Sequence, residues 1–374
     1  MTQKVDVAIV GAGIIGLAHA YVAARAGRTV AIFERNPRAI GASIRNFGMI
    51  WPIGQPPGPL HELALRSREI WLDVLSQAGI AYRATGSLHA AYRADEAAVA
   101  QEFSEAGPNL GYSCAWLSPA ATLEKTNALR PDGLLGSLWS ATELTVDPRE
   151  VIARLPEFLS DQYGVRFFYN TAVTEVQQPH LVAGRERWHA DQILIAAGDD
   201  FQTLFPDAFE NHGLTRSKLQ MLRTAHQPAG FDLGPSLAFG LSFKHYPTFE
   251  ICPSLPKLKR RIAAETPEFD RWGIHVMASQ TSAGEITLGD SHEYGLGVNI
   301  FDNPAIDDLI LDYAREYLRL PCFTIAERWH GVYAKHSELP YLRLTPQSGV
   351  QMITVTSGIG MTLSFGIAEQ TFSR

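Results

Sequence analysis

The amino-terminal segment carries two runs of apolar residues, separated by a glycine-rich turn and an alanine-rich stretch. Residues 5–10 alternate between polar and apolar and then run apolar, a pattern typical of a buried parallel strand. Residues 14–26 have the composition of a helix, and residues 29–33 form the second apolar run. Strand, helix and strand within about 30 residues predict a β–α–β unit, and therefore an α/β fold.

Helical spacing recurs further along the chain. In residues 60–77 the apolar side chains fall near helical intervals, and Gly79 marks the expected end. Residues 148–159 and the closing segment 361–372 predict two further helices. Between these helices the pattern predicts three strands, at residues 165–176, 186–190 and 191–198.

Two intervening stretches have a different pattern. Residues 84–141 show short alternating runs and polar helices, and residues 214–323 are strand-like with many aromatic residues and prolines. They predict a second domain inserted into the first. We expect a Rossmann-type dinucleotide-binding domain at residues 1–83, 142–212 and 328–374, and an α+β substrate domain with a mixed or antiparallel sheet at residues 84–141 and 213–327.

Composition excludes several classes of protein. The net charge of −7 lacks the basic excess of a nucleic-acid-binding protein. Hydrophobic residues make up 46% of the chain, but no run approaches the roughly 18 apolar residues of a membrane span. The three cysteines lie far apart, and the first residues lack the apolar segment of a signal peptide. These features predict a soluble, cytoplasmic protein.

The turn after the first strand reads GAGIIG, with glycines at positions 11, 13 and 16. The first glycine permits a tight turn, the second lets the backbone approach a pyrophosphate, and the third lets the helix pack closely on the strand. Glu34 ends the next strand, where a carboxylate can accept the hydroxyls of a ribose. An acid at that position disfavours a 2′-phosphate, so the motif leaves FAD and NAD open.

A set of motifs spread over the chain resembles the D-amino-acid oxidase superfamily, which contains glycine, sarcosine and D-amino-acid oxidases. After GAGIIG and Glu34 come GASIRNFGMI from residue 41, VDPREVIARL from 146, ILIAAGDD from 193, WHGVYAKH from 329 and SGIGMTLSFGIAE from 357. The resemblance extends nearly from end to end and is weakest in the second domain. It implies a glutathione-reductase-like fold, noncovalently bound FAD and oxidation of an amine, with Cys322 a buried thiol.

The resemblance also implies which residues contact the cofactor. They are Gly11, Gly13, Ile14, Ile15, Gly16, Glu34, Arg35, Gly41, Ala42, Ser43, Asn46, Phe47, Gly48, Val173, Ala197, Gly198, Gly358, Ile359, Gly360, Met361 and Thr362. There is an independent physical reason for the last group. Gly358 and Gly360 leave backbone N–H groups uncovered just before a helix, whose amino end stabilises negative charge on a reduced flavin ring.

The substrate-binding residues depart from the family pattern. Several relatives that oxidise amino acids carry W-x-G-x-R-P, whose arginine grips the substrate carboxylate, but this chain has Tyr333 and Ala334 in place of the arginine and proline. Other groups must therefore hold an anionic substrate. The candidates for substrate binding and catalysis are Arg45, Tyr333, Lys335, His245, Tyr246 and His330, with Arg223, Lys244 and His336 as further cations.

A phosphonate offers three acceptor oxygens and up to two charges, which suits several separate donors better than one bidentate fork. The segments GASIRNFGMIWPIGQ, KLQMLRT and GDSHEYG resemble the branch of this superfamily that is linked to aminophosphonate breakdown. That resemblance implies 2-aminoethylphosphonate, or its N-methylated or hydroxylated analogue, as substrate.

We expect Asp290, His292 and Glu293 to form a turn beside the pocket rather than a metal site, because no second histidine is near in the sequence. Trp51, Trp71 and Trp139 are expected to be packing residues.

Other interpretations remain open at this stage. The chain could be an oxidase of glycine, sarcosine or a D-amino acid, with Lys335 or Arg45 holding the carboxylate, or a flavin-binding protein without catalytic activity. Either oxygen or a separate electron carrier could reoxidise the flavin. The sequence also leaves open whether the protein forms a homo-oligomer.

Overall fold

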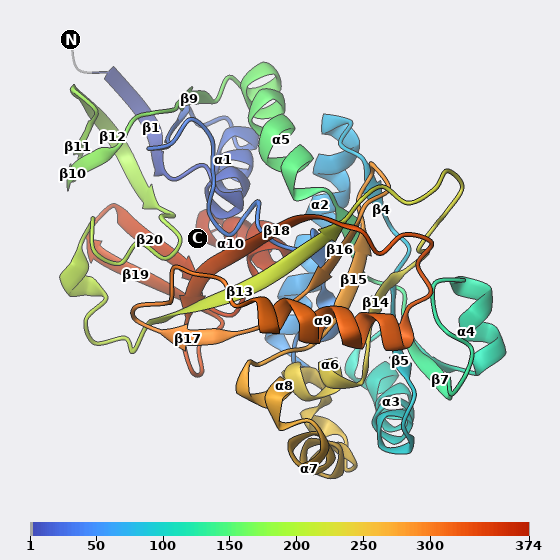
Figure 1. Ribbon diagram of the computed structural model, residues 1–374. Helices are drawn as coiled ribbons and strands as arrows, with labels where there is room; N and C mark the ends of the chain where they lie inside the picture. Colours follow the sequence, from blue (N-terminus) through green and yellow to red (C-terminus); the bar gives the residue numbers. More distant parts are fainter. Residues whose placement is uncertain (1–2, 374) are drawn as a thin grey trace.

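The computed structural model describes residues 3–373 and is built on two large sheets (Figure 1). In the first sheet the central strands run parallel, and an antiparallel hairpin extends one edge. Its strand order is β10 (Val173–Gln177), β11 (His180–Ala183), β12 (Glu186–Ile195), β1 (Gln3–Val10), β2 (Val30–Phe33) and β9 (Arg166–Phe168), with β20 (Val350–Val355) on β12 and β19 (Tyr341–Gln347) on β20.

The second sheet is mostly antiparallel. Its strand order is β17 (Glu293–Gly295), β13 (Thr215–Thr224), β16 (Ile286–Gly289), β15 (Met277–Gln280), β14 (Ser236–Ala238), β5 (Ser87–Ala91), β7 (Gly136–Ser140) and β6 (Cys114–Leu117), with β18 (Ile325–Lys335) on β13. A small third sheet consists of β3 (Met49–Ile50), β8 (Leu144–Val146) and β4 (Tyr82–Arg83). The predicted α/β class with a second, mixed-sheet unit is confirmed.

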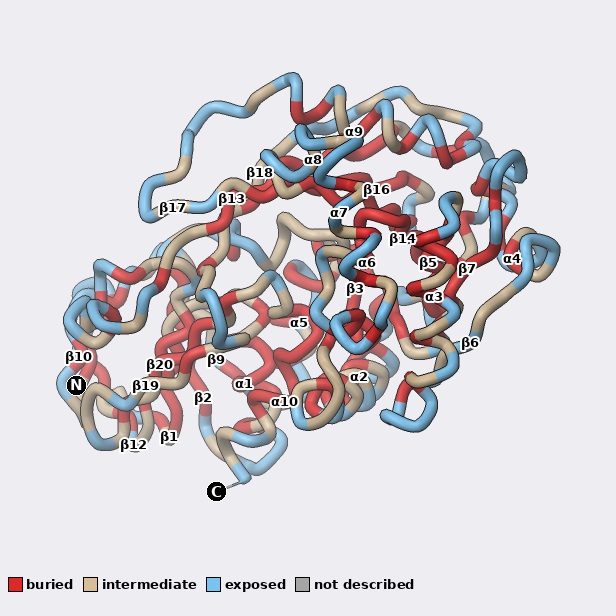
Figure 2. The backbone as a smooth tube through the Cα atoms, turned by 90° about the horizontal axis from the view of Figure 1, so that it is seen from below, coloured by how far each residue is buried: buried red, intermediate tan, exposed pale blue. Residues whose placement is uncertain are grey.

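Ten α-helices complete the described chain. They are α1 (Ile14–Arg25), α2 (Pro59–Ala78), α3 (Ala94–Ala106), α4 (Pro119–Lys125), α5 (Pro148–Tyr163), α6 (Gly240–His245), α7 (Leu255–Glu265), α8 (Pro267–Arg271), α9 (Pro304–Tyr317) and α10 (Gly360–Phe372). The helices α1, α2, α5 and α10 share one core with the first sheet. The helices α3, α6, α7 and α9 pack with the second sheet into another core, and Figure 2 shows the buried backbone concentrated in both layers.

Local signals explain the helices that were predicted. The helix α2 begins at Pro59 and ends before Gly79, which adopts a left-handed conformation with φ 61°. The helix α5 begins after Asp147, whose side chain accepts a hydrogen bond from the backbone N–H of Arg149. The structure therefore confirms the helices predicted at 60–77 and 148–159, each extended by a few residues.

Three sequence expectations differ from the structure. Residues 186–195 form the single strand β12, because the polar residues between the two predicted strands continue the same ladder along β1. The pattern of residues 214–323 predicts strands, but this stretch also contains the helices α6 to α9. In α7 the buried positions Leu255, Leu258 and Ile262 keep helical spacing, but lysines and arginines surround them. Finally, β18 pairs with β13 in the second sheet, so residues 328–335 do not belong to the first sheet as the predicted boundary implied.

No helix within residues 3–373 combines the length and apolar character needed to cross a membrane.

His19 joins α1 to α10 inside the first core. Its Nδ1 lies 2.7 Å from the carbonyl oxygen of Ile15, and its Nε2 lies 3.1 Å from Oγ1 of Thr371. The ring is fully buried, and this burial lowers the pKa of His19 to about 4. Folding therefore requires the neutral ring, while the unfolded chain takes up a proton at its ordinary pKa of about 6.5.

We predict that His19 contributes to loss of stability in mild acid. Because the folded pKa lies below the unfolded one, the stabilisation is fully present above pH 6.5 and is lost as the pH falls toward about 4. The loss should approach about 3 kcal/mol for this group. Urea unfolding at several pH values checks the prediction, since a His19→Gln variant should lose less stability than the parent between pH 6.5 and 4. Equal losses in both proteins would contradict it.

Candidate active site

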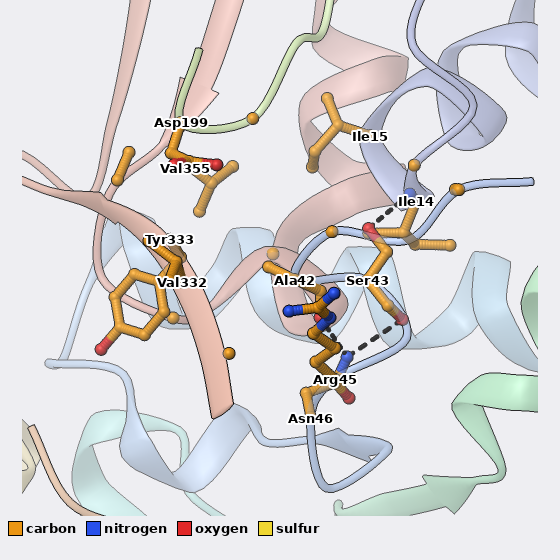
Figure 3. Close-up of a pocket in the computed structure, with 18 of the residues that line it drawn as sticks. Ile14, Ile15, Ala42, Ser43, Arg45, Asn46, Asp199, Val332, Tyr333 and Val355 are labelled. Carbon is orange, nitrogen blue, oxygen red and sulfur yellow. Dashed lines mark hydrogen bonds between the residues drawn. The ribbon is translucent and has the colours of Figure 1, made fainter. Parts of the chain in front are cut away.

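A cavity of about 520 Å³ lies between the two sheets, and both contribute to its wall. Its size is in the range of small-molecule and cofactor sites. The loop between β2 and β3 and the turns before α1 and α10 form one side, and β13, β18 and the ends of β15 and β16 form the other. Figure 3 shows Arg45 on the loop opposite β18, which carries Val332 and Tyr333.

The turn before α1 is held so tightly that only glycine fits. Gly11 has φ 103°, and a Cβ atom there would lie 2.4 Å from the carbonyl oxygen of Ala196. A Cβ atom on Gly16 would lie 2.0 Å from the carbonyl oxygen of Gly11. The helix is therefore pressed against β1, and its amino end opens into the cavity beside Ser43, whose hydroxyl accepts a hydrogen bond from Ile14 N–H at 2.9 Å (Figure 3).

Glu34 is fixed at one end of the cavity. Its carboxylate accepts hydrogen bonds from the backbone N–H of Ala12 at 3.1 Å and of Asn36 at 3.0 Å. The neighbouring Arg35 forms an ion pair of 2.7 Å with Asp200 across the same end. Glu34 and Arg35 both line the cavity, where an oriented carboxylate matches ribose hydroxyls.

A second helix amino end faces the cavity from α10. Gly358 has φ 69°, and a Cβ atom there would lie 3.3 Å from the ring of Tyr333, so this side chain packs directly on the turn. The hydroxyl of Thr362 in the first turn of α10 accepts a hydrogen bond from the backbone N–H of Trp51 at 2.9 Å. The cavity thus has two positive helix ends and an oriented carboxylate, an arrangement that fits the pyrophosphate, flavin and ribose parts of FAD.

Most of the predicted cofactor residues line this cavity. They are Gly11, Gly13, Ile14, Ile15, Glu34, Arg35, Gly41, Ala42, Ser43, Asn46, Phe47, Val173, Ala197, Gly198, Gly358, Ile359, Gly360, Met361 and Thr362. Gly16 and Gly48 do not line it. Gly16 packs α1 on the preceding turn, and a Cβ atom on Gly48 would lie 1.8 Å from the carbonyl oxygen of Val146. Both positions shape the wall through backbone packing.

Four of the six predicted substrate and catalytic residues line the cavity, namely Arg45, His245, Tyr246 and Tyr333. Lys335 and His330 do not. Lys335 is partly buried beside the ring of Tyr294, with Nζ 5.9 Å from the ring centre. Nδ1 of His330 lies 2.9 Å from Oδ1 of Asp302.

The further cations considered from the sequence have partners elsewhere. Arg223 pairs with Glu327, and Lys244 pairs with Asp270. His336 accepts hydrogen bonds from the backbone of the turn that follows it. By contrast, Arg45 donates a hydrogen bond of 3.1 Å to the carbonyl oxygen of His330, and within residues 3–373 no carboxylate forms an ion pair with it. Its charge is therefore available to a ligand.

Asp290 and His292 lie beside the pocket as expected, whereas sequence reasoning missed His275 in the substrate end of the cavity. His275 and Asp290 line the wall together with His245 and His292. The rings of His245 and His275 stack with centres 3.7 Å apart, and those of His275 and His292 lie 5.4 Å apart. The sequence expectation that no second histidine lies near His292 is wrong, because the fold brings in two from other segments.

Backbone pairing explains this convergence. His275 precedes the β15–β16 hairpin and Asp290 follows it, and their backbones extend its ladder with hydrogen bonds of 3.2 and 3.0 Å in the two directions. The backbone N–H of His292 donates to the carbonyl oxygen of Trp272 at 2.7 Å. His245 reaches the same place from the carboxyl end of α6.

The environment sets the protonation of these groups. The protein that surrounds His245 in the cavity wall desolvates its ring and lowers its pKa well below the ordinary value, and the nearby His275, His292 and Lys335 lower it further. Burial also lowers the pKa of His292, although the Asp290 carboxylate opposes this shift. Burial raises the pKa values of Tyr246 and Tyr333 well above the ordinary value, and the charge of Asp290 raises both further. Both phenols therefore keep their protons and can donate hydrogen bonds.

Apolar residues complete the substrate end. Trp51, which we expected to be only a packing residue, lines the cavity beside Tyr246, with their ring centres 6.2 Å apart. Met277 lies next to them and accepts a contact of 3.1 Å from the hydroxyl of Tyr246. Cys114, Cys252 and Cys322 are free thiols that do not line this cavity.

Comparison with known proteins agrees with this geometry. The family model described as "FAD dependent oxidoreductase" (DAO) matches residues 6–374. A glycine oxidase of Geobacillus kaustophilus is 28% identical over 210 residues, which cover 53% of this chain and 55% of that protein. The chain therefore aligns with only about half the length of this curated relative.

Two solved structures have the same fold. The crystal structure of glycine oxidase from Geobacillus kaustophilus has a TM-score of 0.77 at 19% identity, covering 99% of this chain and 94% of that chain. The structure of L-proline dehydrogenase from P. horikoshii has a TM-score of 0.76 at 17% identity, covering 100% and 94% of the two chains.

We predict that Gly16→Ala abolishes tight cofactor binding. The added Cβ atom would collide with the carbonyl oxygen of Gly11, which is backbone and can move only with the whole turn. We expect the affinity for FAD to fall at least about tenfold, because the backbone donors of the turn would leave their positions. The flavin absorbance of the purified protein and titration of the apoprotein with FAD measure this loss. Gly297→Ala is the matched control, since a Cβ atom there meets nothing within 4 Å; equal FAD affinity in both variants would contradict the prediction.

Proposed function

The chain belongs to the DAO family of FAD dependent oxidoreductases, and on that premise we propose that it oxidises the C–N bond of a small amine that carries a phosphonate. The substrates that fit are 2-aminoethylphosphonate and its N-methylated or hydroxylated analogues. For the first two, the expected product is phosphonoacetaldehyde.

The observation that carries this proposal is the set of anion-binding groups at the substrate end. Tyr333 stands on β18 where several relatives have a carboxylate-binding arginine. Arg45 faces the cavity from the opposite loop without a carboxylate partner, and His245 lines the same end. Hydrogen-bond donors on several separate segments of the cavity wall match the three oxygens of a phosphonate better than the two oxygens of a carboxylate.

The chemistry requires a neutral amine held against the flavin. FAD held in this cavity would supply the acceptor for a hydride equivalent from the carbon beside the nitrogen, and hydrolysis of the resulting imine by water would give a carbonyl compound and ammonia or an amine. Trp51, Tyr246 and Met277 surround the substrate end with apolar surface, which favours the uncharged amine over the ammonium form. The phenol of Tyr333 remains protonated beside Gly358 and can orient the substrate by donating a hydrogen bond. Either oxygen or a separate electron carrier would serve as the final electron acceptor.

A second candidate function is oxidation of an amino carboxylate such as glycine or sarcosine. The similarity to a glycine oxidase over about half of its length favours this alternative. Arg45 alone could hold one carboxylate by a bidentate contact. The two candidates therefore differ in the charge and shape of the anion, and not in the reaction at the C–N bond.

We predict that aminophosphonates reduce the bound flavin faster than amino acids do. The purified protein would be mixed without oxygen with 2-aminoethylphosphonate and its N-methylated and 1-hydroxylated forms, and separately with glycine, sarcosine and D-alanine. Bleaching of the flavin absorbance gives the rate. Reduction by the amino acids alone would overturn the phosphonate proposal, and bleaching by no amine in a broad panel would favour a flavin protein without amine oxidation.

Arg45→Met should weaken substrate binding without removing FAD. A charge-assisted contact of this kind is worth about 10- to 100-fold in kcat/KM, so we expect a loss of that size for any anionic amine substrate. Lys259→Met is the matched control, because Lys259 pairs with Glu250 outside the cavity. Steady-state kinetics together with FAD content provide the measurement. Unchanged kinetics in the Arg45 variant would remove this residue from the substrate site.

A further inference from the structure

Three histidines converge in the wall of the cavity. One ring nitrogen from each of His245, His275 and His292 lies within 4.8 Å of the others. His275 and His292 are only 3% and 5% exposed, whereas His245 is exposed where it lines the cavity. The group therefore has a buried base and one side open to a ligand.

The backbone fixes the orientation of His292. Its Nδ1 lies 2.9 Å from the carbonyl oxygen of Gly273, and since a carbonyl can only accept, Nδ1 carries the proton. The lone pair of the neutral ring is then on Nε2, which lies 3.9 Å from Oδ2 of Asp290. A histidine whose other nitrogen donates to a backbone carbonyl has the arrangement that is usual for metal ligands.

Asp290 supplies an independent observation. The residue is only 6% exposed. Its Oδ1 lies 3.0 Å from Nε2 of His275, but it has no hydrogen-bond partner of good geometry. A buried carboxylate oxygen without such a partner is costly. Two ligands of one tetrahedral ion with bonds of about 2.0–2.2 Å are separated by roughly 3.3 Å, so the separation of these two atoms is close to that of ligands sharing one ion.

We propose that His245, His275, His292 and Asp290 bind a divalent transition-metal ion, such as Zn²⁺, in the wall of the cavity. Three imidazoles and one carboxylate form a ligand set that zinc and its neighbours prefer over magnesium or calcium. The proposed ligands include no residue of the glycine-rich turns before α1 and α10.

The ion faces the substrate end because His245 lines the open cavity. Its two positive charges exceed the single negative charge of Asp290, so it takes an oxygen of an anionic substrate as a further ligand. This second step rests on the proposed function, since it names the phosphonate as the group that the ion holds. The binding of the metal does not rest on it.

Metal analysis of the FAD-loaded protein tests the site. Untagged protein would be treated with EDTA, dialysed with Zn²⁺ or Co²⁺, freed of excess metal and examined by elemental analysis. We expect about one equivalent of metal per chain. His245→Gln and His292→Gln should each weaken metal binding at least about tenfold, while FAD content, as the measure of folding, stays at the parent level.

His226→Gln is the matched control, because this histidine is exposed and does not line the cavity. It should keep the full equivalent of metal. The proposal is overturned if the parent holds less than about a tenth of an equivalent, or if the His245 and His292 variants bind metal as tightly as the His226 variant does. If the histidines bind an anion and no metal, the parent protein will hold less than about a tenth of an equivalent of metal.

Methylphosphonate, which has no amine to oxidise, tests the contact with substrate. It should change the visible absorption of the Co²⁺-loaded protein at wavelengths above the flavin bands, and acetate at the same concentration should change it less. An unchanged spectrum overturns the metal–phosphonate contact and leaves the metal site intact. Conversely, the protein could bind the ion while no aminophosphonate reduces its flavin. In that outcome the proposed function fails and the metal site stands.

Discussion

The close approach of Gly16 to the carbonyl of Gly11 is the constraint on which the cofactor side of the cavity depends. It presses α1 onto β1, so that the amino end of the helix points along the carboxyl edge of the parallel strands. The helix α10 packs on α1, and it starts just after β20, which is parallel to β12 in the same sheet. Both helices therefore direct their positive ends into one cavity, where they can bind a dinucleotide with a reducible ring.

The parts of this arrangement that are local in sequence could be predicted. A turn that only glycine can adopt, a helix between Pro59 and Gly79 and the acid that ends β2 each leave their signal within a few residues. The prediction failed where neighbours in space decide the structure. The polar residues in the middle of β12 predict a break between two strands, but the hydrogen-bond ladder along β1 continues through them.

The substrate end could not be predicted in the same way, because its residues come from segments that meet only in the folded chain. His275 and Asp290 are brought together by the backbone pairing beyond the β15–β16 hairpin, and His245 by the end of a six-residue helix that showed no clear pattern. Lys335 is the opposite case. It stands in a recognisable motif, but it is not part of the cavity wall.

Charge connects these two halves of the site. Most cations near the cavity are neutralised: Arg35 by Asp200, Lys244 by Asp270 and Arg223 by Glu327. Arg45 alone can balance the single charge of a carboxylate, whereas a phosphonate with two charges needs a second positive centre to offset its loss of hydration. The ion that we propose on the stacked histidines and Asp290 would provide that centre, because its charge exceeds that of the carboxylate. With the proposed ion in place, the substrate end would have the two positive centres that a doubly charged phosphonate requires.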